Sequence, residues 1–275
     1  MTAVATRARL FRESADGLRM ARAVRGLWPR DDWAGRVVRR ALVEALGQAG
    51  GRREPERIRA IEALRRELAG SDTVIERIDF GAGNGGLTTQ APYHDGVEVV
   101  HTIGDFCRGS CIAPAWSRVL FHLVREAAPV NALELGTGLG LSAAYQGAAL
   151  ELNGHGRLVT IEGAEPLADI ARENLERLGI TTVEVVTGRF REALPPVLER
   201  CRPLEFACID GHHDGRATVD YFRAVLGILD GPAILVFDDI GVSPGMRTAW
   251  DRISRHPRVT LALDLQKLGV CGVGR

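Results

Sequence analysis

From residue 131 onward, short apolar runs alternate with longer stretches in which apolar residues recur every three or four positions. The runs predict strands at 131–136, 157–162, 182–187, 204–210, 232–238, 258–264 and 268–273. The stretches between them predict helices at 142–152, 165–178, 190–200, 215–229 and 245–255. This alternation predicts an α/β fold, a doubly wound and mostly parallel seven-stranded sheet with helices on both faces.

The first half of the chain follows a different pattern. Residues 1–70 have helical periodicity, with Pro55 suited to a first helical turn, and predict an N-terminal helical extension. Residues 71–128 predict a short strand, a glycine loop, a second apolar stretch and a lead-in helix over Pro114–Ala127. Residues 129–275 form the predicted α/β domain. Arginines on the outer faces of the first helices indicate a solvated surface, a homodimer contact or a cap over the active site.

The first strand of the α/β domain ends in a glycine turn that is typical of nucleoside binding. Gly136, Gly138 and Gly140 leave room for a ligand against the backbone, because no Cβ stands in the way. The helix that begins near Ser142 offers free N–H groups to an anionic ligand end. The next predicted strand ends at Glu162, 22 residues past Gly140, where an acid can accept both ribose hydroxyls.

The form of this turn favours S-adenosylmethionine (SAM) over NAD. Dinucleotide sites prefer G-x-G-x-x-G, whereas the third glycine here comes one residue early and position 141 is Leu. Glu134, beside the turn, would repel a pyrophosphate and attract a sulfonium or amino group. A turn that binds nothing is disfavoured by Glu162. The residues expected at the cofactor are Glu134, Gly136, Thr137, Gly138, Gly140, Ser142 and Glu162.

A second glycine-rich segment, 79–86, has a similar sequence but different flanking segments. A weak apolar run precedes it, and the residues that follow do not have a helical pattern. We interpret it as a flexible loop and not as the cofactor site. Together with the N-terminal helices, residues 79–94 are a candidate lid.

Acidic and histidine residues gather where the fourth and fifth predicted strands end. Asp210, Asp238 and Asp239 are expected at one rim of the sheet, where like charges need a compensating cation such as Mg²⁺. A metal would lower the roughly 4 kcal/mol cost of ionising a phenol near pH 7. His213, one helical turn past Asp210, is the candidate base, with His212 as the alternate. The alternative is that these residues only cap turns or lie exposed in loops.

Composition narrows the function classes. Zero formal charge and a pI of about 7.1 argue against nucleic-acid binding. Five cysteines without C-x-x-C spacing indicate reduced thiols and a cytoplasmic protein. No apolar run approaches the roughly 18 residues of a membrane span. Lys267 is the only lysine among 35 cationic residues, a bias that we attribute to genomic GC content.

From about residue 129 to 275, the chain resembles class I SAM-dependent methyltransferases of the catechol O-methyltransferase-like family. The motifs that carry the resemblance are 133–142 (Leu-Glu-Leu-Gly-Thr-Gly-Leu-Gly-Leu-Ser), 158–162, 209–213 and 237–240. The resemblance implies that Gly188, Arg189 and Phe190 flank the adenine. It also implies cofactor contact for Asp210 and metal ligation by Asp210, Asp238 and Asp239.

The expected activity is therefore SAM-dependent O-methylation of a small-molecule hydroxyl, with Mg²⁺ as a candidate assistant. His213 and Asp210 are the expected catalytic residues, although His213 stands where the catechol enzymes have a lysine base. An NAD-dependent oxidoreductase and a non-catalytic SAM-binding protein are the alternatives.

Overall fold

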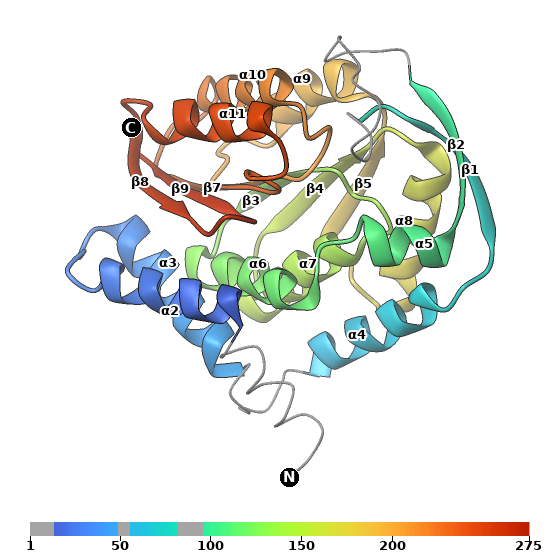
Figure 1. The fold of residues 1–275 in the computed structure, drawn as a ribbon, viewed down its shortest axis with the longest axis horizontal. Coiled ribbons are helices and arrows are strands. Elements are labelled where there is room, and N and C mark those ends of the chain that lie inside the picture. The colour runs from blue at the N-terminus through green and yellow to red at the C-terminus, as the bar shows by residue number, and fades with distance from the viewer. Residues whose placement is uncertain (1–13, 49–55, 82–95, 275) are drawn as a thin grey trace.

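The computed structural model describes residues 14–48, 56–81 and 96–274 (Figure 1). Its centre is a seven-stranded sheet in the order β5-β4-β3-β6-β7-β9-β8. The strands are β3 (Asn131–Leu135), β4 (Arg157–Glu162), β5 (Val183–Thr187), β6 (Phe206–Ile209), β7 (Ala233–Phe237), β8 (Val259–Asp264) and β9 (Gly269–Val273). Within this sheet, β9 runs antiparallel to the other six strands, which are parallel to one another. The predicted doubly wound sheet is confirmed.

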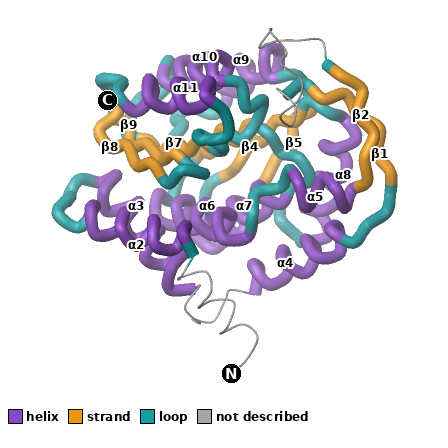
Figure 2. Tube along the Cα trace, viewed as in Figure 1, coloured by secondary structure: helices purple, strands orange, loops and turns teal. Residues whose placement is uncertain are grey.

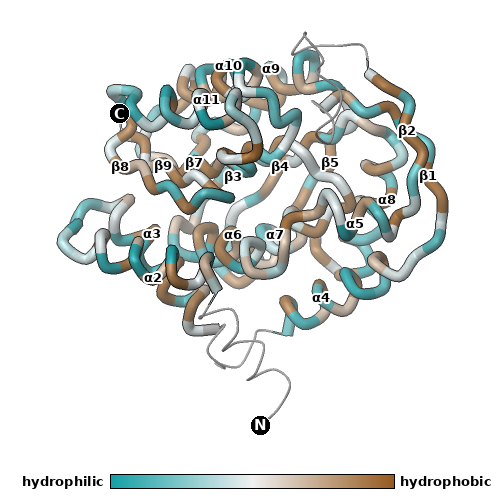
Figure 3. The backbone as a smooth tube through the Cα atoms, in the orientation of Figure 1, coloured by the Kyte–Doolittle hydropathy of each residue, from teal (hydrophilic) through white to brown (hydrophobic). Residues whose placement is uncertain are grey.

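Helices cover both faces of this sheet, as Figure 2 shows. One layer holds α9 (Phe190–Arg200), α10 (Gly215–Leu226) and α11 (Pro244–Ser254). The other holds α6 (Pro114–Ala127), α7 (Leu141–Asn153) and α8 (Glu165–Arg177). Because both faces are covered, the central strand β7 is a continuous buried apolar run, and hydrophobic (brown) segments lie inside the molecule in Figure 3.

The N-terminal helices extend the second layer. They are α2 (Ala15–Leu27), α3 (Trp33–Gln48) and α4 (Glu56–Ala69). Met20, Val38 and Leu42 are fully buried in the same apolar core as α6 and α7. The division of the chain at residues 70 and 128 stays a prediction.

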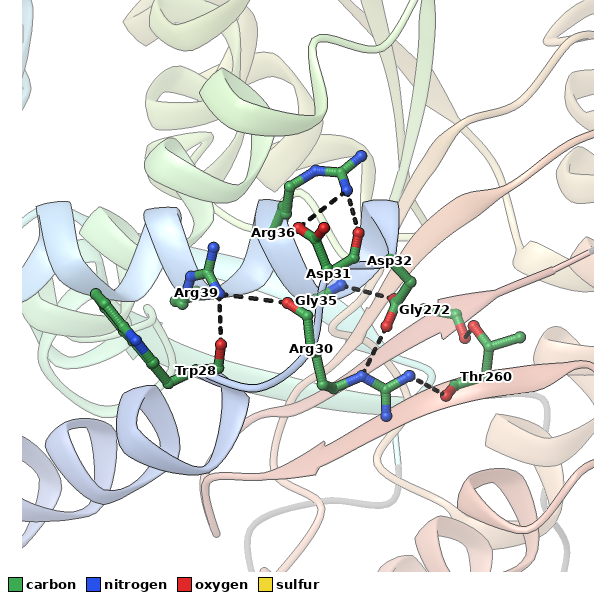
Figure 4. Close-up of polar contacts among 9 residues, drawn as sticks. All are labelled: Trp28, Arg30, Asp31, Asp32, Gly35, Arg36, Arg39, Thr260 and Gly272. Carbon is green, nitrogen blue, oxygen red and sulfur yellow. Dashed lines mark hydrogen bonds and ion pairs between the residues drawn. The ribbon is translucent and has the colours of Figure 1, made fainter.

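A polar cluster fastens the start of α3 to the edge of the sheet (Figure 4). The guanidinium of Arg30 donates to the Thr260 carbonyl of β8 at 2.8 Å and to Asp32 at 2.9 Å. Asp32 also accepts the N–H of Gly35 at 2.9 Å, which caps the helix. The helix approaches β9 closely, since a Cβ at Gly272 would lie 2.3 Å from the Cβ of Ala34.

Residues 71–81 and 96–113 add a two-stranded sheet and a short helix beside α8 and α4. The strands β1 (Val74–Asp79) and β2 (Val97–Thr102) form an antiparallel pair, as the two predicted apolar stretches suggested. The helix α5 (Ile103–Gly109) follows directly, capped by the Thr102 hydroxyl, which accepts the N–H of Asp105 at 3.0 Å. The helix α5 was not predicted, because one short helix gives little periodicity.

None of the described helices is both long and apolar enough to cross a lipid bilayer.

Candidate active site

A cavity of about 950 Å³ opens at the carboxyl ends of the sheet strands. This is where ligands bind in open α/β sheets. Its wall combines the glycine turn after β3, the end of β4, the loops after β6 and β7, and the end of β1. The predicted site residues on the wall are Gly136, Thr137, Gly138, Ser142, Glu162, Arg189, Phe190, Asp210, His213 and Asp239.

The glycine turn is shaped by three left-handed backbone positions. Gly136 has φ +100°, and a Cβ there would lie 2.2 Å from the carbonyl oxygen of Asp210. Gly138 has φ +52° and faces the ring of Phe106. Gly140, with φ +80°, lies at the N-cap of α7 and packs against α8 away from the cavity wall. The turn therefore needs glycine both for its conformation and for close approach.

Glu162 lies at the end of β4 and faces the cavity. Its carboxylate accepts the backbone N–H groups of Gly138 and Ala164, each at 2.9 Å. Burial raises the pKa of Glu162, and these two N–H groups oppose that shift. The acid therefore joins the end of β4 to the glycine turn.

Glu134 lies behind the turn and does not reach the cavity wall. Its carboxylate is fully buried and accepts the Thr160 hydroxyl at 2.7 Å and the Gln146 amide at 2.5 Å. The Thr160 hydroxyl also contacts that of Thr137 at 2.7 Å. Burial raises the pKa of Glu134 to about 7. Glu134 was expected at the cofactor, but the structure places it off the cavity wall. It belongs to a chain of four hydrogen-bonded residues behind the glycine turn.

The expected adenine side is lined by aromatic rings. Phe190 packs edge-to-face on Tyr221, with ring centroids 5.5 Å apart. The guanidinium of Arg189 lies 4.9 Å from the ring centre of Phe80. Gly188 precedes these residues and is not on the wall.

The start of the second glycine segment contributes to this same cavity. The cavity is lined by Arg77, Asp79, Phe80 and Gly81. Residues 79–94 were expected to form a lid and not part of the cofactor site. Arg77 is held by His101 at 2.8 Å and by Asp79 at 3.1 Å. Residues 82–94, the rest of the candidate lid, lie outside the described residues.

The two histidines occupy different environments on the wall. Nε2 of His213 lies 3.9 Å from Oδ1 of Asp210. Nδ1 of His212 is 2.9 Å from the hydroxyl of Tyr221, which fixes that ring. Both histidines have positive φ, +46° and +72°, as does Asp239 at +52°. Such strain in non-glycine residues costs on the order of 1–3 kcal/mol each and gathers at functional sites.

A lysine completes the acidic cluster. Nζ of Lys267 donates to Asp238 at 2.8 Å and to Asp239 at 2.6 Å. Burial alone would lower the pKa of Lys267, but the two carboxylates outweigh burial and raise it. Burial, with Asp238 close by, raises the pKa of Asp210 well above its ordinary value. Lys267 was not expected at the site, although its being the only lysine was a visible signal.

Comparison with known proteins agrees with this geometry. Residues 133–240 match a family described as a methyltransferase domain. A catechol O-methyltransferase of Niastella koreensis is 30% identical over 131 residues, which cover 47% of this chain and 58% of that protein. The chain thus spans a little over half the length of this curated relative.

Solved structures give the same result. The O-methyltransferase of Bacillus cereus in complex with SAH superimposes with a TM-score of 0.51 at 27% identity, covering 61% of this chain and 84% of that one. The O-methyltransferase TomG of Streptomyces achromogenes, in complex with SAM, shares the fold with a TM-score of 0.54 at 19% identity, covering 86% and 98%. Residues 133–240 thus match a methyltransferase domain, and the chain shares the fold of these O-methyltransferases.

Proposed function

We propose that this protein is a SAM-dependent O-methyltransferase that acts on a hydroxyl of a small molecule. One observation carries the proposal: a single cavity joins a nucleoside-binding acid, Glu162, to a histidine and carboxylate pair, His213 and Asp210. A cofactor and an acceptor bound there would lie against each other.

The wall fits the three parts of SAM. Glu162 would accept the ribose hydroxyls, and Phe190 with Arg189 would flank the adenine. The backbone around Gly136 and Gly138, with Ser142 at the start of α7, would hold the amino-acid end. When bound, SAM supplies a methyl group on a sulfonium, which an oxygen nucleophile displaces in line.

The chain's own residues must place the acceptor and take its proton. His213 is the favoured base, because it lines the cavity and its Nε2 lies 3.9 Å from Asp210, which can orient and stabilise an imidazolium. His212 is the alternate, but its Nδ1 is already engaged by Tyr221. Exclusion of water by the wall would add to positioning.

The decisive experiment is a calorimetric titration of SAM into the folded protein, repeated with Glu162→Ala and with NADH. Micromolar SAM binding that Glu162→Ala weakens, with no NADH binding, supports the proposal. NADH binding in place of SAM would point to an oxidoreductase. SAM binding that Asp210→Asn and His213→Ala leave unchanged, without turnover on any phenol or hydroxylated acceptor, would point to a SAM-binding protein without catalysis.

We also propose a homodimer through the N-terminal helices. Trp28 and Leu18, on or beside α2, are 70% and 61% exposed and would be available to a partner copy. Light scattering would give twice the chain mass for the wild type and a monomer for Leu18→Ser with Trp28→Ser. A monomeric wild type would exclude this proposal.

A cytoplasmic location is proposed from the cysteines. All five are free thiols in the structure, as expected in a reducing compartment. Thiol titration of protein unfolded directly from cell extract should count five free groups, and a lower count would contradict the proposal.

A further inference from the structure

The turn between β8 and β9 brings a cation to the place where the family resemblance implies a metal. Pairing of Phe237 with Gly269 sets the start of β9 beside the end of β7. The Lys267 side chain therefore reaches Asp238 and Asp239, which follow β7 directly. Lys267 lines the cavity together with Asp210 and Asp239.

The backbone fixes this lysine in position. The N–H of Lys267 donates to the Leu265 carbonyl at 2.9 Å within the hairpin turn. The carbonyl of Lys267 accepts the N–H of Ile240 at 3.3 Å, which ties the hairpin to the loop after β7. Since Asp238 is buried and its Oδ2 lies 2.8 Å from the ammonium, the pair is part of the folded site and not a surface contact.

These residues do not fit a divalent metal. Oδ2 of Asp238 and Oδ1 of Asp239 already accept from Lys267. An ammonium has no lone pair to offer a metal, and its charge repels one. Across residues 14–48, 56–81 and 96–274, no three His, Cys, Asp or Glu side chains are arranged to hold a metal ion.

We propose that Lys267 replaces the divalent metal and binds the acceptor oxygen. This inference rests on the proposed methyltransferase function. Two of the three ammonium N–H bonds are donated to Asp238 and Asp239, and the third can be donated to an oxygen in the cavity. The developing oxyanion would then be stabilised by a fixed cation held by two carboxylates.

The reaction balances with the groups present and the methyl donor. The O–H bond of the acceptor breaks and its proton passes to His213. The acceptor oxygen forms a bond to the methyl carbon, the C–S bond breaks, and its electron pair remains on the sulfur of the donor. Lys267 keeps its protons throughout.

This arrangement also defines a substrate class. A metal can chelate two vicinal oxygens, whereas one N–H of Lys267 binds a single oxygen. We therefore expect acceptors with one weakly acidic hydroxyl, such as simple phenols. Removing the second hydroxyl of a catechol should leave kcat/KM within about tenfold, because only one oxygen is held.

Whether a metal binds beside Lys267 can be tested without an activity assay, because lysine labelling reports on this one residue. Protein grown with lysine labelled at the ε-carbon should give one side-chain NMR signal, from Lys267. Titration with millimolar Mg²⁺, with SAH present, should leave this signal in place. A saturable shift would show that the ion displaces the ammonium and would overturn the proposal.

Variants test the acceptor role. Lys267→Met should retain SAM affinity and lose about 10²–10³-fold in kcat, as removal of an oxyanion donor does. Lys267→Arg, which keeps a donor cation, should retain more turnover than Lys267→Met. Arg247→Met is the matched control, since it breaks the 2.5 Å ion pair to Asp264 at the base of the same hairpin but lies off the cavity wall, and turnover should persist.

The outcomes separate the two proposals. Wild-type turnover that survives EDTA, with loss in Lys267→Met, supports the lysine role. EDTA-sensitive turnover, or full activity in Lys267→Met, overturns it while leaving the methyltransferase function intact. If the wild type binds no SAM, the proposed function is wrong. The NMR titration alone then tests whether Lys267 excludes a metal.

Discussion

The carboxylate of Glu162 accepts the N–H of Gly138 at 2.9 Å, so this acid, the proposed ribose ligand, is joined to the glycine turn before any ligand binds. The same carboxylate accepts the N–H of Ala164, which leaves it oriented toward the cavity. The acid therefore positions the turn.

Glu162→Gln should weaken SAM binding by about 10–100-fold. The NH₂ group of the new amide would face one of the two backbone N–H groups that Glu162 now accepts, and the ribose would have one acceptor fewer. Loss of a hydrogen bond to a charged group costs about 1.5–3 kcal/mol of binding free energy. Calorimetry measures the loss. Glu165→Gln, an exposed glutamate in the first turn of α8, is the control and should bind like the wild type. Equal affinity in both variants would show that the ribose lies elsewhere.

Gly136→Ala should destabilise the protein by about 3 kcal/mol or more. The new Cβ would lie 2.2 Å from the Asp210 carbonyl, a backbone atom that cannot move without shifting the catalytic loop. Gly154→Ala, at φ +75° with nothing within 4 Å of the new Cβ, should cost only about 1–2 kcal/mol. Thermal unfolding of both variants checks this order. Equal losses of stability would mean that the backbone around Gly136 shifts and makes room for the new Cβ.

Several parts of the site follow from local sequence alone. Glu162 was predictable because strand, glycine turn, helix and strand are consecutive, and the register of β3 with β4 follows from that connection. The helix Pro114–Ala127 was predicted to the residue, since a proline opens it and Pro129 follows its end.

The remainder depends on contacts between distant segments. Lys267 meets Asp238 only because the terminal hairpin inserts β9 next to β7, and local pattern does not encode that pairing. Phe80 enters the wall through a separate two-stranded sheet. Glu134 was correctly predicted to lie beside the turn. The direction of its carboxylate, however, depends on the hydrogen bond from Thr160 on the neighbouring strand.

Glu134 should make stability depend on pH. Its folded pKa of about 7 lies above the ordinary 4.5, so between these values the folded protein holds a proton that the unfolded chain has released. This contribution is full below about pH 4.5 and is lost as pH rises through 7, by on the order of 3 kcal/mol. Urea unfolding at pH 5 and pH 8 measures it.

Glu134→Gln supplies the comparison for that measurement. The variant has no titrating group there, and its amide can donate to Oε1 of Gln146, a buried atom that has no hydrogen-bond partner in the structure. The wild type should therefore lose stability relative to Glu134→Gln between pH 5 and pH 8. Parallel curves would show that Glu134 is ionised in the folded protein at both values.

His213→Gln should lower kcat by about 10²–10⁴-fold at saturating SAM while SAM affinity stays unchanged, because it removes the proposed proton acceptor and none of the cofactor contacts. His212→Gln should have a smaller effect, since that ring is held by Tyr221 at 2.9 Å, and Tyr221→Phe should reproduce it. Single-turnover rates with a phenolic acceptor separate the two histidines. If His212→Gln were inactive and His213→Gln normal, the base would be His212, and the 3.9 Å approach of His213 to Asp210 would serve only to shape the loop.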